Sequence, residues 1–164
     1  MGMKKTQWYI GAPNGVVLCV DRMELGRMVG TFYHAYQREG TVFRTVDELL
    51  FELEHFYNWI NFPRQSTNDR TFSDDTSYVA ASREERIKVM TDEELLKKHG
   101  DLGSFVVRVQ HRQNSSWQGR ITWMDEDKTV NFRSIWEMIK LIDDALNTAS
   151  GPEDGLEDVS WPEA

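Results

Sequence analysis

The chain of 164 residues contains one cysteine, Cys19, so it cannot form a disulfide within itself. No group of Cys and His residues offers the four ligands of a structural zinc site. The basic start, residues 1–7, is not followed by an apolar run long enough for a signal peptide or a membrane span. These absences predict a cytoplasmic protein that is neither secreted nor inserted in a membrane, and the length fits one globular domain.

The sequence also lacks the signatures of catalysis. It contains no Walker loop, dinucleotide fingerprint or nucleophile elbow. The adjacent carboxylates at positions 74–75 and 143–144 point apart on a strand or a helix, so they make poor acid–base pairs. Four histidines are far apart and lack the flanking ligands of a metal site, namely His34, His55, His99 and His111. We therefore expect no enzyme activity, no metal and no cofactor.

Basic residues are outnumbered, and most of the acidic excess lies at the C-terminal end. The net charge is −8, but residues 149–164 hold five acids and no Lys or Arg, and the remaining 22 acids against 19 bases leave −3. The composition of this tail is typical of a disordered, solubilising segment. Its apolar residues Leu156, Val159 and Trp161 leave open a second role, in which the tail docks onto the domain or a partner.

The sequence contains an internal duplication. A shift of 89 positions aligns residues 16–58 with residues 105–147 without a gap. Seven positions are identical, and the substitutions between them preserve residue character, as in Thr45 and Ser134 or Leu53 and Ile142. The agreement in pattern predicts two copies of one folding unit.

Each copy has the pattern of three strands and a helix. In the second copy, alternating apolar residues predict strands over 104–112 and 117–124 and a short strand over 129–132, and Ser134 with Glu137 predicts a capped helix start. Thr45 with Glu48 is the equivalent in the first copy. We expect an α+β domain over 1–148 with a mainly antiparallel sheet covered by helices and pseudo-two-fold symmetry, followed by the tail. The connection 61–103 is expected to be partly helical, over 82–90 and over 91–99, where Thr91 with Glu94 forms a third capping box. The spacing leaves open whether the copies share one sheet or form two lobes.

The second copy resembles a known group of sequences. The matching stretches are FVVRVQ at 105–110, RQNSSWQG at 112–119, FRS at 132–134 and IKLID at 139–143. They are similar to a family of small uncharacterised proteins of clostridia and related Firmicutes. The first copy matches more loosely and the tail does not match. The resemblance implies a bacterial or mobile-element origin, and the family brings no activity or catalytic residues to transfer.

Two groups of residues are candidates for binding a partner. The first is one face of the predicted strands, where a basic surface would be formed by Arg108, Gln110, Arg112, Arg120 and Thr122. A solvated sheet face explains the same alternation. The second group is tryptophans outside the core pattern, because Trp is enriched at binding hot spots. Trp136 falls off the apolar stripe of its helix, and Trp161 lies in the tail.

Three functions fit these observations. The first is a regulatory or inhibitory module that binds a protein partner without catalysis, indicated by the missing catalytic motifs, the tryptophans and the tail. The second is an acidic nucleic-acid mimic of the anti-CRISPR type, suggested by a pI near 5.0. The third is nucleic-acid or nucleotide binding on the Arg108, Arg112 and Arg120 face. We expect the first. The oligomeric state is left open.

Overall fold

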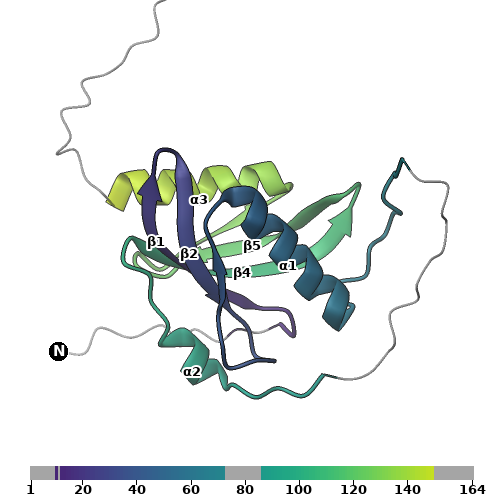
Figure 1. The fold of residues 1–164 in the computed structure, drawn as a ribbon, viewed down its shortest axis with the longest axis horizontal. Coiled ribbons are helices and arrows are strands. Elements are labelled where there is room, and N and C mark those ends of the chain that lie inside the picture. Colours follow the sequence, from purple (N-terminus) through teal and green to yellow (C-terminus); the bar gives the residue numbers. More distant parts are fainter. Residues whose placement is uncertain (1–9, 11, 73–85, 150–164) are drawn as a thin grey trace, which may run out of the picture.

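Six antiparallel strands form one open sheet in the computed structural model, which describes residues 10, 12–72 and 86–149 (Figure 1). The strand order is β3-β2-β1-β4-β5-β6, so the two β-β-β-α segments share a single sheet and meet where β1 pairs with β4. The expected α+β class is confirmed. The elements are β1 (Val16–Glu24), β2 (Arg27–Tyr33), β3 (Thr41–Phe43), α1 (Val46–Ile60), α2 (Asp92–Leu96), β4 (Gly103–Gln113), β5 (Ser116–Trp123), β6 (Lys128–Phe132) and α3 (Ile135–Ala149).

Each helix begins at a hydroxyl cap that the sequence predicts. The side-chain oxygens of Thr45, Thr91 and Ser134 accept a hydrogen bond from the backbone N–H three residues on, at 3.2, 3.2 and 3.1 Å. Each bond satisfies a donor that the first helical turn leaves unpaired. α1 ends at Asn61, whose left-handed conformation (φ 53°) stops the helix. Within the described part of the chain, no helix has both the length and the apolar content needed to cross a bilayer.

The two faces of the sheet are covered by different parts of the chain. α1 and α3 pack on one face, where Val16, Leu18 and Val20 of β1 join the larger apolar core. On the other face, Ile10 and the α2 residue Leu95 belong to a smaller core around the middle strands. The side chains of each strand alternate between these two cores because successive residues in a strand point to opposite faces.

The connection between the two segments is less helical than the sequence predicts. Of the expected helix over 82–90, residues 82–85 lie outside the described residues, and residues 86–90 are not helical. The N–H groups of Val89 and Met90 instead donate to the carbonyl of Ala35, at 2.7 and 3.1 Å, which ties this stretch to the chain after β2. The expected helix over 91–99 forms only as α2, five residues long.

Strand pairing follows the same register in both halves. Val17 opposes Tyr33 across β1 and β2, and Val106 opposes Thr122 across β4 and β5, at equivalent positions under the shift of 89. Each of these hairpins has a β-bulge, between Val20 and Arg22 and between Val109 and His111, again 89 residues apart. A bulge places one extra residue in its strand, so the side chains beyond it change faces.

A glycine lies opposite each bulge, and the close backbone approach there requires it. A Cβ at Gly30 would lie 2.0 Å from the carbonyl oxygen of Cys19, and one at Gly119 would lie 2.0 Å from that of Arg108. We expect Gly30→Ala and Gly119→Ala each to lower the free energy of unfolding by about 2–3 kcal/mol, because the strands must move apart. Urea unfolding measures both. A large loss of stability in one variant and no loss in the other would contradict the equivalence of the two bulges.

Candidate functional site

The three arginines expected on one sheet face do not share it, which corrects the sequence interpretation. Arg108 and Arg120 are direct neighbours across β4 and β5. The bulge between Val109 and His111 turns Arg112 to the opposite, helix-covered face, where it lies across from buried Trp117. Alternation counted from sequence fails here because it assumes no inserted residue.

On the outer face, the half-buried Arg108 forms hydrogen bonds within the domain. Its Nε donates to the carbonyl oxygen of Ile10 at 2.6 Å, and its Nη1 lies 3.4 Å from Oγ1 of Thr122. Thr122 is buried and shares a 2.8 Å hydrogen bond with Thr129. Arg120 alone of the three arginines is exposed. The basic surface is therefore smaller than the sequence predicts.

Arg112 is 4% exposed and joins β4 to the end of α1. Its Nε donates to the carbonyl oxygen of Pro63 and its Nη1 to Oδ1 of Asn58, both at 2.7 Å. Burial lowers the pKa of Arg112, while the nearby carboxylates Glu54 and Asp69 favour the charged form. A guanidinium suits this position because its planar donors reach two acceptors at once.

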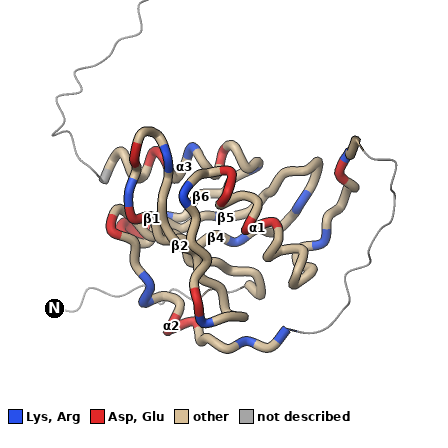
Figure 2. The backbone as a smooth tube through the Cα atoms, in the orientation of Figure 1, with Lys and Arg blue, Asp and Glu red and all other residues tan. Residues whose placement is uncertain are grey.

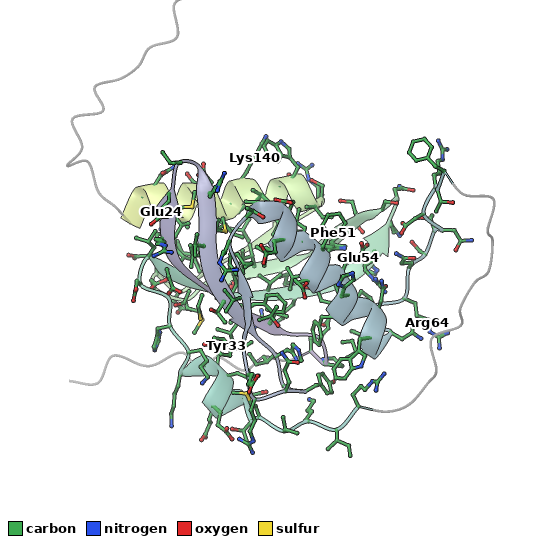
Figure 3. The ribbon with its side chains drawn as sticks, viewed as in Figure 1. Glu24, Tyr33, Phe51, Glu54, Arg64 and Lys140 are labelled. Carbon is green, nitrogen blue, oxygen red and sulfur yellow. The ribbon has the colours of Figure 1, made fainter. Side chains whose placement is uncertain are left out.

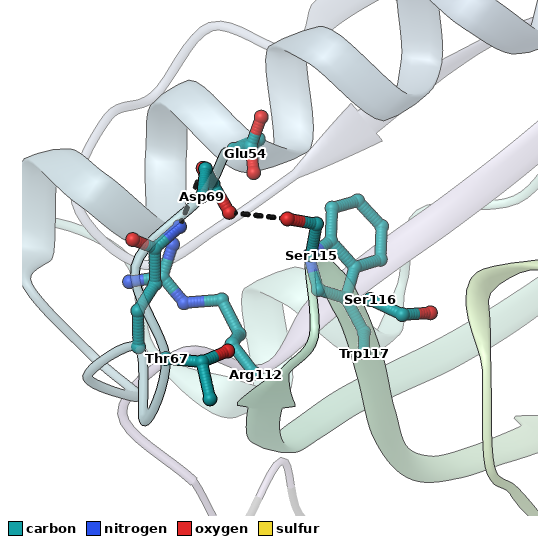
Figure 4. Close-up of a pocket in the computed structure, with 8 residues that line it drawn as sticks. Glu54, Thr67, Asp69, Arg112, Ser115, Ser116 and Trp117 are labelled. Carbon is teal, nitrogen blue, oxygen red and sulfur yellow. Dashed lines mark hydrogen bonds between the residues drawn. The ribbon is translucent and has the colours of Figure 1, made fainter. Parts of the chain in front are cut away.

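Residues 65–69, called the strap here, lie along the end of β4 and the β4–β5 turn (Figure 4). The N–H of Ser66 donates to the carbonyl of Arg112 at 3.0 Å. The N–H of Asn114 donates to Oγ1 of Thr67 at 2.8 Å, and Oγ of Ser115 donates to Oδ1 of Asp69 at 2.6 Å. These bonds fix the strap beside α1, and Asp69 lines the same pocket as Glu54.

A groove of about 350 Å³ runs between the first turns of α1, the strap and the start of α3. We call it the acidic groove. It continues into a shallow polar pocket that Arg112 lines, and the two share Glu54, Asp69, Ser115 and Trp117. The residues lining the groove include three carboxylates and neither Lys nor Arg: Asp47, Leu50, Phe51, Glu54, Asp69, Ser115, Trp117 and Ile135. The groove is therefore an apolar surface with a negative rim.

Phe51 is the most unusual residue of this groove. Its side chain is 60% exposed although it lies in the middle of a 15-residue helix. Phe51 and Glu54 are three residues apart, on one side of α1 (Figure 3). A hydrogen bond with the Thr45 side chain lowers the pKa of Asp47, which keeps this carboxylate charged at the mouth of the groove.

Ser115 and Asp69 form a polar pair, but neither pocket includes a histidine among its lining residues. A serine nucleophile of the triad type depends on an imidazole base held against it. The bond between Ser115 and Asp69 fixes the strap, and its geometry supplies no activated nucleophile. No cluster of three or more His, Cys, Asp or Glu that could hold a metal ion occurs in residues 10, 12–72 and 86–149.

The predicted tryptophan sites have different outcomes. Trp136 is 65% exposed on α3, directly after the groove residue Ile135, and the Nζ of Lys140 lies 5.3 Å from its ring centroid. Trp161 lies outside the described residues. Sequence reasoning missed Phe51, although the signal that selected Trp136 applies to it, because Phe51 also falls off the apolar stripe of its helix.

The charges of the described chain do not separate by sign. Figure 2 shows Asp and Glu interspersed with Lys and Arg along the chain. The nucleic-acid mimic stays a prediction, since mimicry depends on a row of carboxylates at phosphate-like spacing. No family model, curated protein or solved structure matches the chain.

Proposed function

We propose that this protein is a non-catalytic interaction module that regulates or inhibits a partner protein, and that the acidic groove binds a basic segment of that partner. The observation that carries the proposal is Phe51, 60% exposed at the wall of a groove rimmed by Asp47, Glu54 and Asp69. An apolar side chain of the partner would pack against Phe51, with Lys or Arg residues on either side facing the carboxylates.

Two physical arguments support this choice of partner. Large aromatic side chains that become fully desolvated carry much of the energy of protein interfaces, and exposing one costs the free protein solubility. Carboxylates around such an anchor attract a basic segment and raise its association rate. Buried Trp117 beneath the groove supplies a rigid floor, so little ordering accompanies binding.

The experiment is a peptide-display selection on the wild-type protein, with binders to Phe51→Asp removed. We expect the selected peptides to carry Lys or Arg around an aromatic or aliphatic residue, and to bind more weakly as salt is added. Selected peptides that are acidic, or whose affinity is insensitive to salt, would refute the proposal.

Truncation of Phe51 gives the sharpest mutational prediction. Phe51→Ala is expected to weaken binding of a selected peptide at least tenfold, an effect of about 2 kcal/mol, because the anchor is lost. Stability should change by less than about 0.5 kcal/mol, since the side chain is exposed. The matched control is Val42→Ala on β3, an exposed apolar residue next to buried Phe43 and on the other sheet face. Isothermal titration calorimetry measures the affinities, and equal values for the two variants would contradict the assignment.

The two halves of the sheet are proposed to descend from one unit and to be related by a pseudo-two-fold axis between β1 and β4. In support, Val17 of β1 pairs with Val106 of β4, and these two residues are equivalent under the shift of 89. A two-fold rotation between β1 and β4 would therefore exchange them. The equivalent bulges and glycines support the same relation. A bacterial or mobile-element origin rests on the resemblance of residues 105–143 to the clostridial proteins.

A further inference from the structure

Four aromatic rings meet at the end of α1, away from the acidic groove. Phe56 and Trp59 come from the last turns of α1, and His34 and Tyr36 come from the chain just after β2. The rings of His34 and Phe56 are stacked at 4.0 Å, and those of Tyr36 and Trp59 are perpendicular, with centroids 6.2 Å apart. Perpendicular rings of this kind pack edge to face, and we call the four rings the aromatic corner.

Trp59 is the open side of this corner, with 41% of its surface exposed. The structure places one cation on its ring, since Cζ of Arg86 lies 4.4 Å from the ring centroid. The Nε of Arg86 also reaches the carbonyl oxygen of Trp59, at 3.5 Å in an exposed position. Arg86 lies 27 residues beyond Trp59 in the sequence, so this contact is supplied from a distant part of the chain.

The corner is electrically suited to a cation. Burial lowers the pKa of His34 to about 4, and its Nδ1 accepts a hydrogen bond from the N–H of Tyr36 at 3.1 Å. The imidazole is therefore neutral near pH 7 and does not repel a positive group. The negative faces of the rings attract a cation, most strongly for indole.

We propose that the face of the Trp59 ring that Arg86 covers is a binding site for a guanidinium group, and that an arginine side chain of a partner can take the place of Arg86 there. Guanidinium is the chosen class because it stacks flat on aromatic rings and is the group already present there. The site is independent of the acidic groove. It lies on the same helix, eight residues from Phe51 and about 12 Å along the axis.

The contact with Arg86 is weak enough to be displaced. An exposed cation–π pair favours its closed state by a factor of about two to five. A ligand competes with this internal group, so removing Arg86 raises the apparent affinity by one plus that ratio, about three- to sixfold.

The test is a titration with N-acetylarginine amide, followed through the indole N–H resonance of Trp59 in nitrogen–proton spectra. The neutral isostere N-acetylcitrulline amide is the matched ligand. We expect Arg86→Ala to bind the arginine probe about three to six times more tightly than the wild type. Trp59→Leu in the Arg86→Ala background removes that reporter, so this variant is followed through the backbone N–H resonance of Tyr36, which should no longer shift. Lys140→Ala, which removes the cation at Trp136, should leave binding unchanged.

Two results would overturn the proposal. One is an Arg86→Ala protein, folded by its spectrum, in which the arginine probe leaves the Trp59 resonance unmoved. The other is an equal response to the citrulline probe, which would assign the shift to apolar contact. Neither result bears on the proposed binding by the acidic groove, because none of the residues changed in this test lines the groove.

Discussion

Acidification from pH 7 to pH 4 is expected to lower the free energy of unfolding by about 3 kcal/mol through His34 alone. The pKa of His34 is about 4 in the folded protein, against an ordinary value of 6.5, because burial disfavours the charged imidazole. Between these two values the unfolded chain binds the extra proton and the folded chain does not. The stabilisation is therefore complete above pH 6.5 and is lost as the pH falls toward 4.

Urea unfolding at a series of pH values measures this effect. Carboxylates also titrate over part of the range, so the informative quantity is the difference between wild type and His34→Phe, which keeps an aromatic ring against Phe56. We expect His34→Phe to be less stable at pH 7, because Tyr36 loses its acceptor, and to lose about 3 kcal/mol less on acidification. Parallel slopes for wild type and His34→Phe would disprove this role for His34.

Loss of the Arg112 side chain is expected to cost about 3–4 kcal/mol of stability. Arg112→Ala leaves the carbonyl oxygen of Pro63 and Oδ1 of Asn58 without their charged donor. It also opens a cavity beside buried Tyr57 and Trp117. Arg112→Lys should recover only part of the loss, because a single ammonium cannot reproduce the planar guanidinium.

Chemical denaturation of Arg112→Ala and Arg120→Ala provides the comparison. Arg120 is exposed on β5, and its truncation should change stability by less than about 0.5 kcal/mol. The Arg112 variant should also loosen the strap, because it loses the side-chain hydrogen bond to the carbonyl oxygen of Pro63, two residues before the strap begins. Equal stability of the two alanine variants would show that the buried guanidinium contributes nothing.

Much of this fold can be read from the sequence because local patterns determine it. Alternating apolar residues and hydroxyl caps predict the strands of the second half and the starts of all three helices. These features depend on neighbours within a few residues. The same reasoning predicts a helix where residues 86–90 are not helical, because hydrogen bonds to Ala35, more than 50 residues away, decide that stretch.

The candidate site is less accessible to sequence reasoning. No residue type marks the bulge between Val109 and His111 in the sequence. This bulge nevertheless determines which face of the sheet Arg112 occupies. The acidic groove depends on the strap, whose bonds to Arg112 and Ser115 span 46 residues of sequence. The apolar stripe of α1 predicts that Phe51 lies outside the core. It does not predict that Phe51 lines a groove, because the other walls come from the strap and Ile135, which are distant in the sequence.

The most direct measurement is hydrogen exchange of the protein with and without a selected basic peptide. If the acidic groove is the binding surface, protection should appear in residues 47–54 of α1 and at 115–117, and it should disappear in Phe51→Ala. Protection confined to the outer sheet face around Arg120, with α1 unchanged, would contradict the account.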